Sequence, residues 1–263
     1  SSDSGLYSGL TYPPAFGTPV AVGMLLAGRL SIHLAAVSIA LLILVLCLLI
    51  GFGSRFERPY HLHAALCLCF LAYTVYPVIQ AFSLTGPILP VLERLGYYGI
   101  FLLVVLFQAK LYGVPKKAYL PMAVLGVIIL LSGAAQPFIR VPIAEVKYLY
   151  SDLLSWYKWL TAAWLFGVSI WAVWKQQPYF LPMTAGFCVL AAALIIDRII
   201  PLYEPILAGW PLETAGFVLI LIVTGILWRD AVNTFQESVL LRSEKAALEE
   251  AGRMKSEFLN NLS

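Results

Sequence analysis

The sequence predicts an all-α membrane protein in which a bundle of seven transmembrane helices continues into a cytoplasmic coiled-coil helix. Of its 263 residues, 61% are hydrophobic and only 12% are charged, whereas roughly a quarter of the residues of soluble domains are charged. The apolar residues fall into separate runs, and the composition changes abruptly after Trp228, where charged residues become frequent. The net charge of +3 is spread over loop ends, so nucleic-acid binding is not indicated.

Seven apolar segments approach the roughly 20 residues that a helix needs to cross a bilayer. They are Leu30–Ile50, Leu62–Phe82, Leu95–Leu111, Ala118–Ala135, Trp156–Trp174, Tyr179–Ile196 and Thr214–Trp228. The fifth segment is supported by tryptophans near both of its ends, as at membrane interfaces. The seventh is short, but Pro211 suits the first turn of a helix and lengthens it. Seven spans is the predicted count, with six as the fallback.

The residues before the first span, 1–29, are rich in glycine and proline and carry few charges. This composition predicts an extracytoplasmic segment that is too short to be a domain of its own, either a loop or the frayed end of a preceding domain. Basic residues in short loops mark the cytoplasmic side of a membrane protein. Loops that alternate along the chain contain Arg55 and Arg58, then Lys116 and Lys117, then Lys175, and finally Arg229. We therefore expect a multi-pass protein of the cell membrane, with its N-terminus outside and its C-terminus in the cytoplasm.

Polar residues within apolar spans are candidates for sensing or for hydrogen bonds between helices. Five are singled out: Tyr76, Gln80, Gln108, Asp197 and Arg198. Tyr76 and Gln80 flank Pro77, so their surroundings are interpreted either as a ligand pocket or as a packing kink. Asp197 and Arg198 fall near the outer headgroups, where interfacial charges and a sensing role both remain open.

The four cysteines all fall inside apolar runs and have no polar co-ligands nearby in the sequence. Neither a disulfide framework nor a metal site is predicted. We also find no P-loop and no other ATP-binding motif. The chain itself is therefore expected to hold no catalytic residue, cofactor or metal.

The region after Trp228 predicts an aqueous helix that continues the seventh span, because 11 of the 31 charged residues lie between Arg229 and Ser263 and no proline follows Pro211. Apolar residues recur there at heptad spacing, which is typical of a coiled-coil seam. The seam residues are Leu241, Leu248, Ala251, Phe258 and Leu262. The expected partner is the same helix of a second subunit, which makes a homodimer.

The last residues carry the most specific motif. Lys255-Ser256-Glu257-Phe258-Leu259, with Ser263 at the matching offset, resembles the start of the phospho-acceptor helix of bacterial sensor histidine kinases. In that family His-Glu follows directly, so the resemblance places the acceptor histidine immediately after Ser263. It also implies a downstream domain that uses ATP and magnesium, autophosphorylation of that histidine, and phosphotransfer to a response regulator.

The seven spans resemble the seven-transmembrane receptors with diverse intracellular signalling modules. Residues Ser54–Arg58 are similar to the charged first cytoplasmic turn of that family, and Leu190–Asp197 to the end of its sixth span. The resemblance implies a histidine kinase, diguanylate cyclase or phosphatase output. Two further hypotheses are a transporter and a non-enzymatic receptor, each with a cytoplasmic helical tail.

Together these patterns predict four regions of the chain. They are an N-terminal segment (1–29), a seven-transmembrane sensor domain (30–228), a juxtamembrane coiled-coil signalling helix (229–252), and the start of the dimerisation and histidine phosphotransfer helix (253–263). In this interpretation the sensor domain relays a stimulus through the signalling helix to a kinase.

Overall fold

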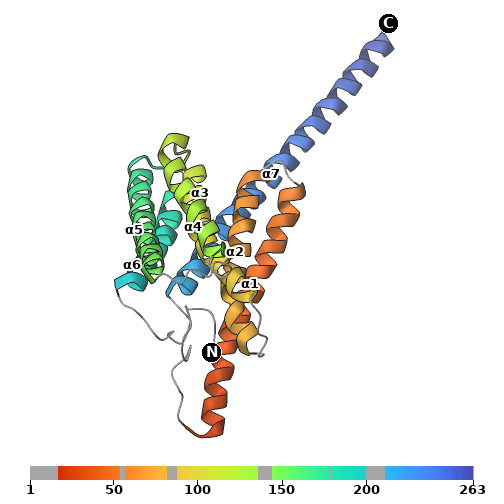
Figure 1. Cartoon of the computed structure of the whole chain (residues 1–263). Coiled ribbons are helices and arrows are strands. Elements are labelled where there is room, and N and C mark those ends of the chain that lie inside the picture. Colours follow the sequence, from red (N-terminus) through yellow and green to blue (C-terminus); the bar gives the residue numbers. More distant parts are fainter. Residues whose placement is uncertain are drawn as a thin grey trace. The chain divides into compact units, whose positions relative to one another are not determined.

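The computed structural model describes residues 17–53, 57–81, 88–135, 144–177, 179–199 and 211–262. Over these ranges the chain is helical and forms no strand, as the all-α prediction requires (Figure 1). The helices are α1 (Pro19–Gly53), α2 (Glu57–Ala81), α3 (Ile88–Leu111), α4 (Lys116–Ala135), α5 (Ala144–Trp174), α6 (Phe180–Ile199) and α7 (Pro211–Leu262). Each predicted span corresponds to one of these helices.

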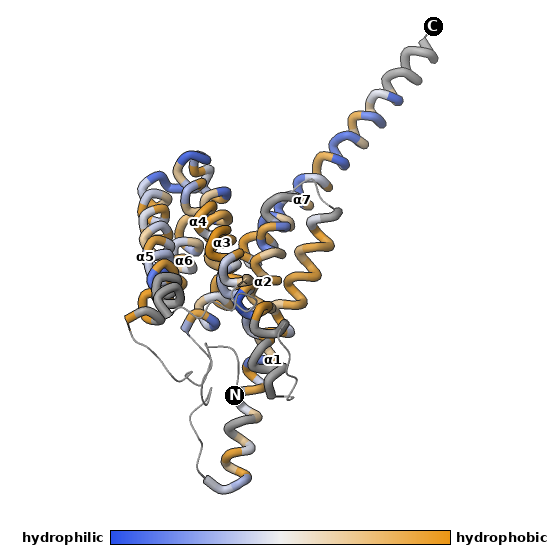
Figure 2. Tube along the Cα trace, in the orientation of Figure 1, coloured by the Kyte–Doolittle hydropathy of each residue, from blue (hydrophilic) through white to orange (hydrophobic). Residues whose placement is uncertain are grey.

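Several helices are long and apolar enough to cross a membrane. Judged by length and composition, they are four: Leu30–Gly51 in α1, Val91–Leu111 in α3, Lys116–Ala135 in α4 and Pro211–Met254 in α7. Shorter apolar stretches cover Tyr60–Val75 in α2 and Phe180–Ile196 in α6. Figure 2 shows apolar residues along α1 to α4 and a mixture of polar and apolar residues along the C-terminal part of α7. The helices are compatible with a membrane protein, and the count of seven spans stays a prediction.

Helix α1 begins at Pro19, 11 residues before the start of the predicted first span at Leu30. The residues around its start explain this difference. The Thr18 hydroxyl accepts a hydrogen bond from the Ala21 backbone N–H at 3.3 Å, which caps the helix, and Pro19 occupies the first helical position, where its missing N–H has no partner to lose. Part of the segment 1–29 is therefore helical, because residues 20–27 continue the apolar character of the helix on the other side of Arg29.

Two glycines allow α3 to approach α2 closely. A Cβ atom at Gly96 would lie 2.5 Å from the Cys69 carbonyl oxygen and 2.6 Å from the Tyr73 backbone nitrogen, and one at Gly99 would lie 2.6 Å from Cys69 Sγ. Small residues serve this purpose in membrane helix pairs, because association there depends on close packing. Helices α2 and α3 thus form a tightly packed pair, and α3 also contacts α4 and α5.

The α3–α4 and α5–α6 turns share one kind of helix end. After α3, the N–H of Val114 donates to the carbonyl of Ala109 at 2.8 Å and that of Gly113 to Lys110 at 3.4 Å. Gly113 has a φ of 64°, so the pattern is a Schellman motif. After α5 the same pattern has Gln176, with a φ of 47°, in the left-handed position.

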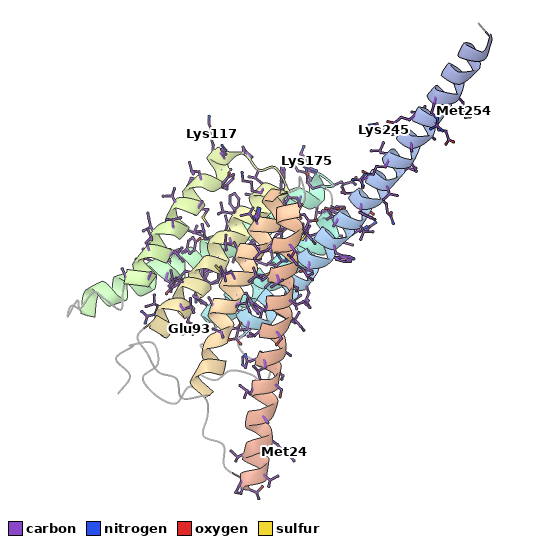
Figure 3. The ribbon with its side chains drawn as sticks, turned by 90° about the vertical axis from the view of Figure 1, so that its right-hand side faces the viewer. Met24, Glu93, Lys117, Lys175, Lys245 and Met254 are labelled. Carbon is purple, nitrogen blue, oxygen red and sulfur yellow. The ribbon has the colours of Figure 1, made fainter. Side chains whose placement is uncertain are left out.

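These two turns place basic residues together. Lys117 and Lys175 lie at one end of the helix bundle, and Glu93 lies at the opposite end (Figure 3). Lys110, Lys116, Lys117 and Lys175 are all exposed. Which side of a membrane this basic end faces remains a prediction.

The chain divides into two compact units, residues 1–223 and 224–263. The first unit contains α1 to α6 and the first turns of α7. The second unit is the remainder of α7, and most of its described side chains are exposed.

Candidate functional site

The first turns of α7 are buried in the helix bundle. Leu212, Leu219 and Val223 are each at most 2% exposed. The Phe217 ring stacks on Phe70 of α2 with ring centroids 6.2 Å apart. A Cβ atom at Gly186 of α6 would lie 2.9 Å from Leu219. The start of α7 is therefore held between α2 and α6 by packed apolar side chains.

A buried histidine and glutamate connect α1 to α7. The distance between His33 Nδ1 and Glu213 Oε2 is 3.9 Å, and the two residues are 9% and 5% exposed. Glu213 lies in the first turn of α7, where the helix dipole favours a carboxylate. Ionisable groups among apolar helices are costly to bury and are typically paired and functional. The pair is a polar connection between α1 and α7.

The sequence reasoning missed both members of this pair. His33 falls within the first predicted span, and Glu213 directly precedes the seventh predicted span, which begins at Thr214. Ionisable residues in or beside two apolar runs are a signal of a functional pair. The signal was present, but the sequence does not show that the two runs are neighbours.

Gln108 lies where α3 contacts α5. It is fully buried, and its Nε2 donates to the Leu165 carbonyl at 3.1 Å and to Ser169 Oγ at 3.1 Å. The Gln108 amide therefore supplies a hydrogen-bond donor to a backbone carbonyl and a hydroxyl inside an apolar interface that excludes water. It is one of the five polar residues that the sequence singles out within spans.

Tyr157 of α5 is 1% exposed, and its hydroxyl faces α4. A Cβ atom at Gly126 of α4 would overlap that hydroxyl, so the glycine makes room for the tyrosine. The Tyr157 ring also meets Phe101 of α3 edge-on, with centroids 6.5 Å apart. Tyr157 therefore connects α5 to both α3 and α4.

At the basic end, two buried hydroxyl groups lie near each other, on Tyr112 directly after α3 and on Thr184 of α6. Burial raises the pKa of the Tyr112 hydroxyl, and the Thr184 side chain opposes that increase. Each hydroxyl can donate or accept, so the two groups suit each other as partners.

The other predicted residues are distributed along the helices. Six of them have helical backbones, but their side chains lie outside the described part of the structure: Tyr76, Gln80, Asp197, Arg198, Phe258 and Leu262. Leu241 and Leu248 are 64% and 74% exposed, and Ala251 is exposed as well. These three seam residues present an apolar stripe on the second unit that stays exposed among the described residues.

Metal ligands do not gather among the described residues. No group of three or more His, Cys, Asp or Glu side chains there is placed to hold a metal ion, and Cys47, Cys67, Cys69 and Cys188 are free thiols.

Comparison with known proteins gives no relative. No protein family, no curated protein and no solved structure matches the chain.

Proposed function

We propose that this chain is the membrane sensor portion of a bacterial two-component sensor histidine kinase, with α7 as the relay between sensor and kinase. The observation that carries the proposal is the continuity of α7. It is a single 52-residue helix that begins with buried turns beside His33 and ends in the Lys255–Leu259 motif.

A helix of this length is a suitable mechanical element. At 1.5 Å per residue it measures about 78 Å. Lys245 Nζ lies 3.8 Å from Glu249 Oε1 one turn further along, an i,i+4 pair that favours the helix on its exposed part. A shift or rotation at Glu213 would be passed along the backbone hydrogen bonds towards Lys255.

The proposed output needs a second subunit. Leu241, Leu248 and Ala251 are the described members of the heptad seam, and they are exposed on a single chain. Pairing two such helices would bury them in a short coiled coil. A short coil with two packings of similar free energy is an element that a small movement can bias.

The kinase chemistry would lie outside these residues. By resemblance, the acceptor histidine follows Ser263, and a further domain transfers the γ-phosphoryl group of ATP to it with magnesium. Phosphoryl transfer depends mostly on alignment and charge neutralisation. A change of register in α7 would therefore be sufficient to change the rate. Seven spans, an outside N-terminus and a cytoplasmic C-terminus belong to the same proposal.

The test is phosphorylation of the full-length gene product in membrane vesicles with labelled ATP. The expected result is an acid-labile phosphate on a histidine directly after Ser263, which is lost when that histidine is replaced by glutamine. An undiminished label in this variant, or a gene that continues into a cyclase or phosphatase domain, would overturn the kinase assignment. A gene that encodes none of these domains would favour the two remaining hypotheses, a transporter and a non-enzymatic receptor.

A further inference from the structure

An open groove with a volume of about 440 Å³ lies between α5 and α6. Phe166, Ile170 and Val173 of α5 and Cys188 of α6 form its apolar walls. Ile170 is 69% exposed and Val173 is 43% exposed. In a membrane such a surface faces lipid, so an acyl chain is the molecule that fits the walls of the groove.

The walls of the groove are almost wholly apolar, although two residues that line it, Ser169 and Thr184, carry hydroxyl groups. Ser169 Oγ accepts a hydrogen bond from Gln108, and Thr184 Oγ1 is buried next to the Tyr112 hydroxyl. The contact between the groove and its occupant is therefore made by apolar side chains.

The mouth of the groove is aromatic and positively charged. Trp174 lines it and is 79% exposed, as tryptophans at membrane interfaces are. Lys175 Nζ lies 5.3 Å from the centre of the Trp174 ring, a cation–π contact. Lys175 therefore stands at the level where lipid phosphates lie.

The charges around this mouth are of one sign. Figure 3 shows Lys117 at the same end of the bundle as Lys175, and Lys110 and Lys116 adjoin the same α3–α4 turn. The sequence of the α3–α4 and α5–α6 turns contains no acidic residue. This end of the bundle thus attracts anions, and its charge complements an anionic headgroup.

We propose that the α5–α6 groove is a binding site for one anionic phospholipid of the leaflet at the basic end. Its phosphate contacts Lys175, its glycerol ester lies at the level of Trp174, and one acyl chain lies along Phe166 and Cys188. Along the helices, Cys188 and Phe166 lie about 12 to 14 Å deeper than the turn. This is the order in which phosphate, glycerol ester and acyl chain follow one another in the lipid. The proposal requires a membrane location but not the kinase assignment.

The test is native mass spectrometry of the chain purified in mild detergent. Phosphatidylglycerol and phosphatidylcholine with the same acyl chains are added in equal amounts. The expected result is one retained phosphatidylglycerol at several-fold higher occupancy than phosphatidylcholine. Lys175→Gln should reduce that preference about fivefold, since a lysine near an anionic lipid surface contributes about 1 kcal/mol. Val173→Trp, which fills the groove from its exposed rim, should reduce retention of both lipids.

The matched control is Lys117→Gln, which removes the same charge from the same end of the bundle but not from the groove. If Lys117→Gln weakens phosphatidylglycerol binding as much as Lys175→Gln does, diffuse attraction explains the preference and the site is refuted. Equal retention of the two lipids refutes it as well. If Val173→Trp changes the dimer fraction and leaves lipid retention unaltered, the groove belongs to a second copy of the chain. Thermal unfolding of each variant checks that these losses do not come from misfolding.

Discussion

His33 Nδ1 lies 3.9 Å from Glu213 Oε2, and this buried contact joins α1 to the first turn of α7. Glu213 lies at the start of α7, which continues without a break to Leu262. A change in the pair at one end of the helix is therefore a change at the start of the proposed relay.

The His33–Glu213 pair should contribute to stability as a coupled unit. Glu213→Gln and His33→Gln are each expected to lower the free energy of unfolding by about 1 to 3 kcal/mol, because each leaves a buried polar group poorly matched. A double-mutant cycle in detergent, followed by thermal unfolding, should give a coupling of at least about 0.5 kcal/mol. Glu237→Gln, at an exposed position of α7, is the control. Strictly additive effects would show that the two side chains do not interact.

The contact between α2 and α3 should depend on Gly96. Gly96→Ala places a methyl group against the backbone of Cys69 and Tyr73, and backbone cannot rotate away as a side chain does. We expect a loss of about 1 to 3 kcal/mol in unfolding free energy. Gly167→Ala in α5 meets nothing within 4 Å and should be neutral or stabilising by up to about 1 kcal/mol. If Gly96→Ala and Gly167→Ala changed the unfolding free energy equally, α3 would not approach α2 closely at Gly96.

Helix identity was predictable from the sequence because apolar runs of sufficient length have few alternatives to helix in a chain of this composition. Helix ends were less predictable. Helix α1 begins at Pro19, and its first turns are apolar but are separated from the predicted span by Arg29. Helix α5 begins at Ala144, 12 residues before the predicted span at Trp156, and this extension contains Glu145, Lys147 and Asp152. A charged residue that ends an apolar run does not end a helix.

The polar contacts of the site were predictable only in part. Gln108 was identifiable as a polar residue within an apolar run, but its partners Leu165 and Ser169 lie 57 and 61 residues away in the chain. The His33–Glu213 pair depends on the same kind of non-local proximity. A single sequence identifies which groups need partners, and the packing of the helices decides which partners they find.

Gln108 should hold α3 and α5 together. Gln108→Leu removes both hydrogen bonds to α5 and is expected to cost about 0.5 to 1.5 kcal/mol of unfolding free energy, the usual range for hydrogen bonds between membrane helices. Ser132→Ala is a suitable control, since Ser132 Oγ donates to the Ile129 carbonyl of its own helix at 2.9 Å. An unfolding free energy that is unchanged in Gln108→Leu but lowered in Ser132→Ala would contradict this prediction.

The exposed seam should control association of the second unit. Leu248 is 74% exposed on a single chain, so Leu248→Asp is expected to weaken dimerisation at least tenfold by placing a charge in the proposed interface. Sedimentation equilibrium in detergent measures the dissociation constant. Glu250→Gln changes an exposed charge outside the heptad seam and should leave the constant within about twofold. If the dissociation constant of Leu248→Asp is unchanged, the dimer contact lies outside the heptad seam.

Insertions in α7 test whether the helix transmits a signal through its rotational register. One residue inserted after Arg242 turns everything beyond it by about 100° and moves Leu248 out of line with Leu241. Seven inserted residues lengthen the helix by two turns and restore its phase to within about 20°. In the full-length protein, the single insertion should change autophosphorylation severalfold, and the heptad insertion should leave it near the original level. If both insertions have the same effect, length rather than register controls the output. If neither insertion changes autophosphorylation, α7 is not the relay, because a helix that passes its rotation to the kinase must alter the kinase when that rotation is changed.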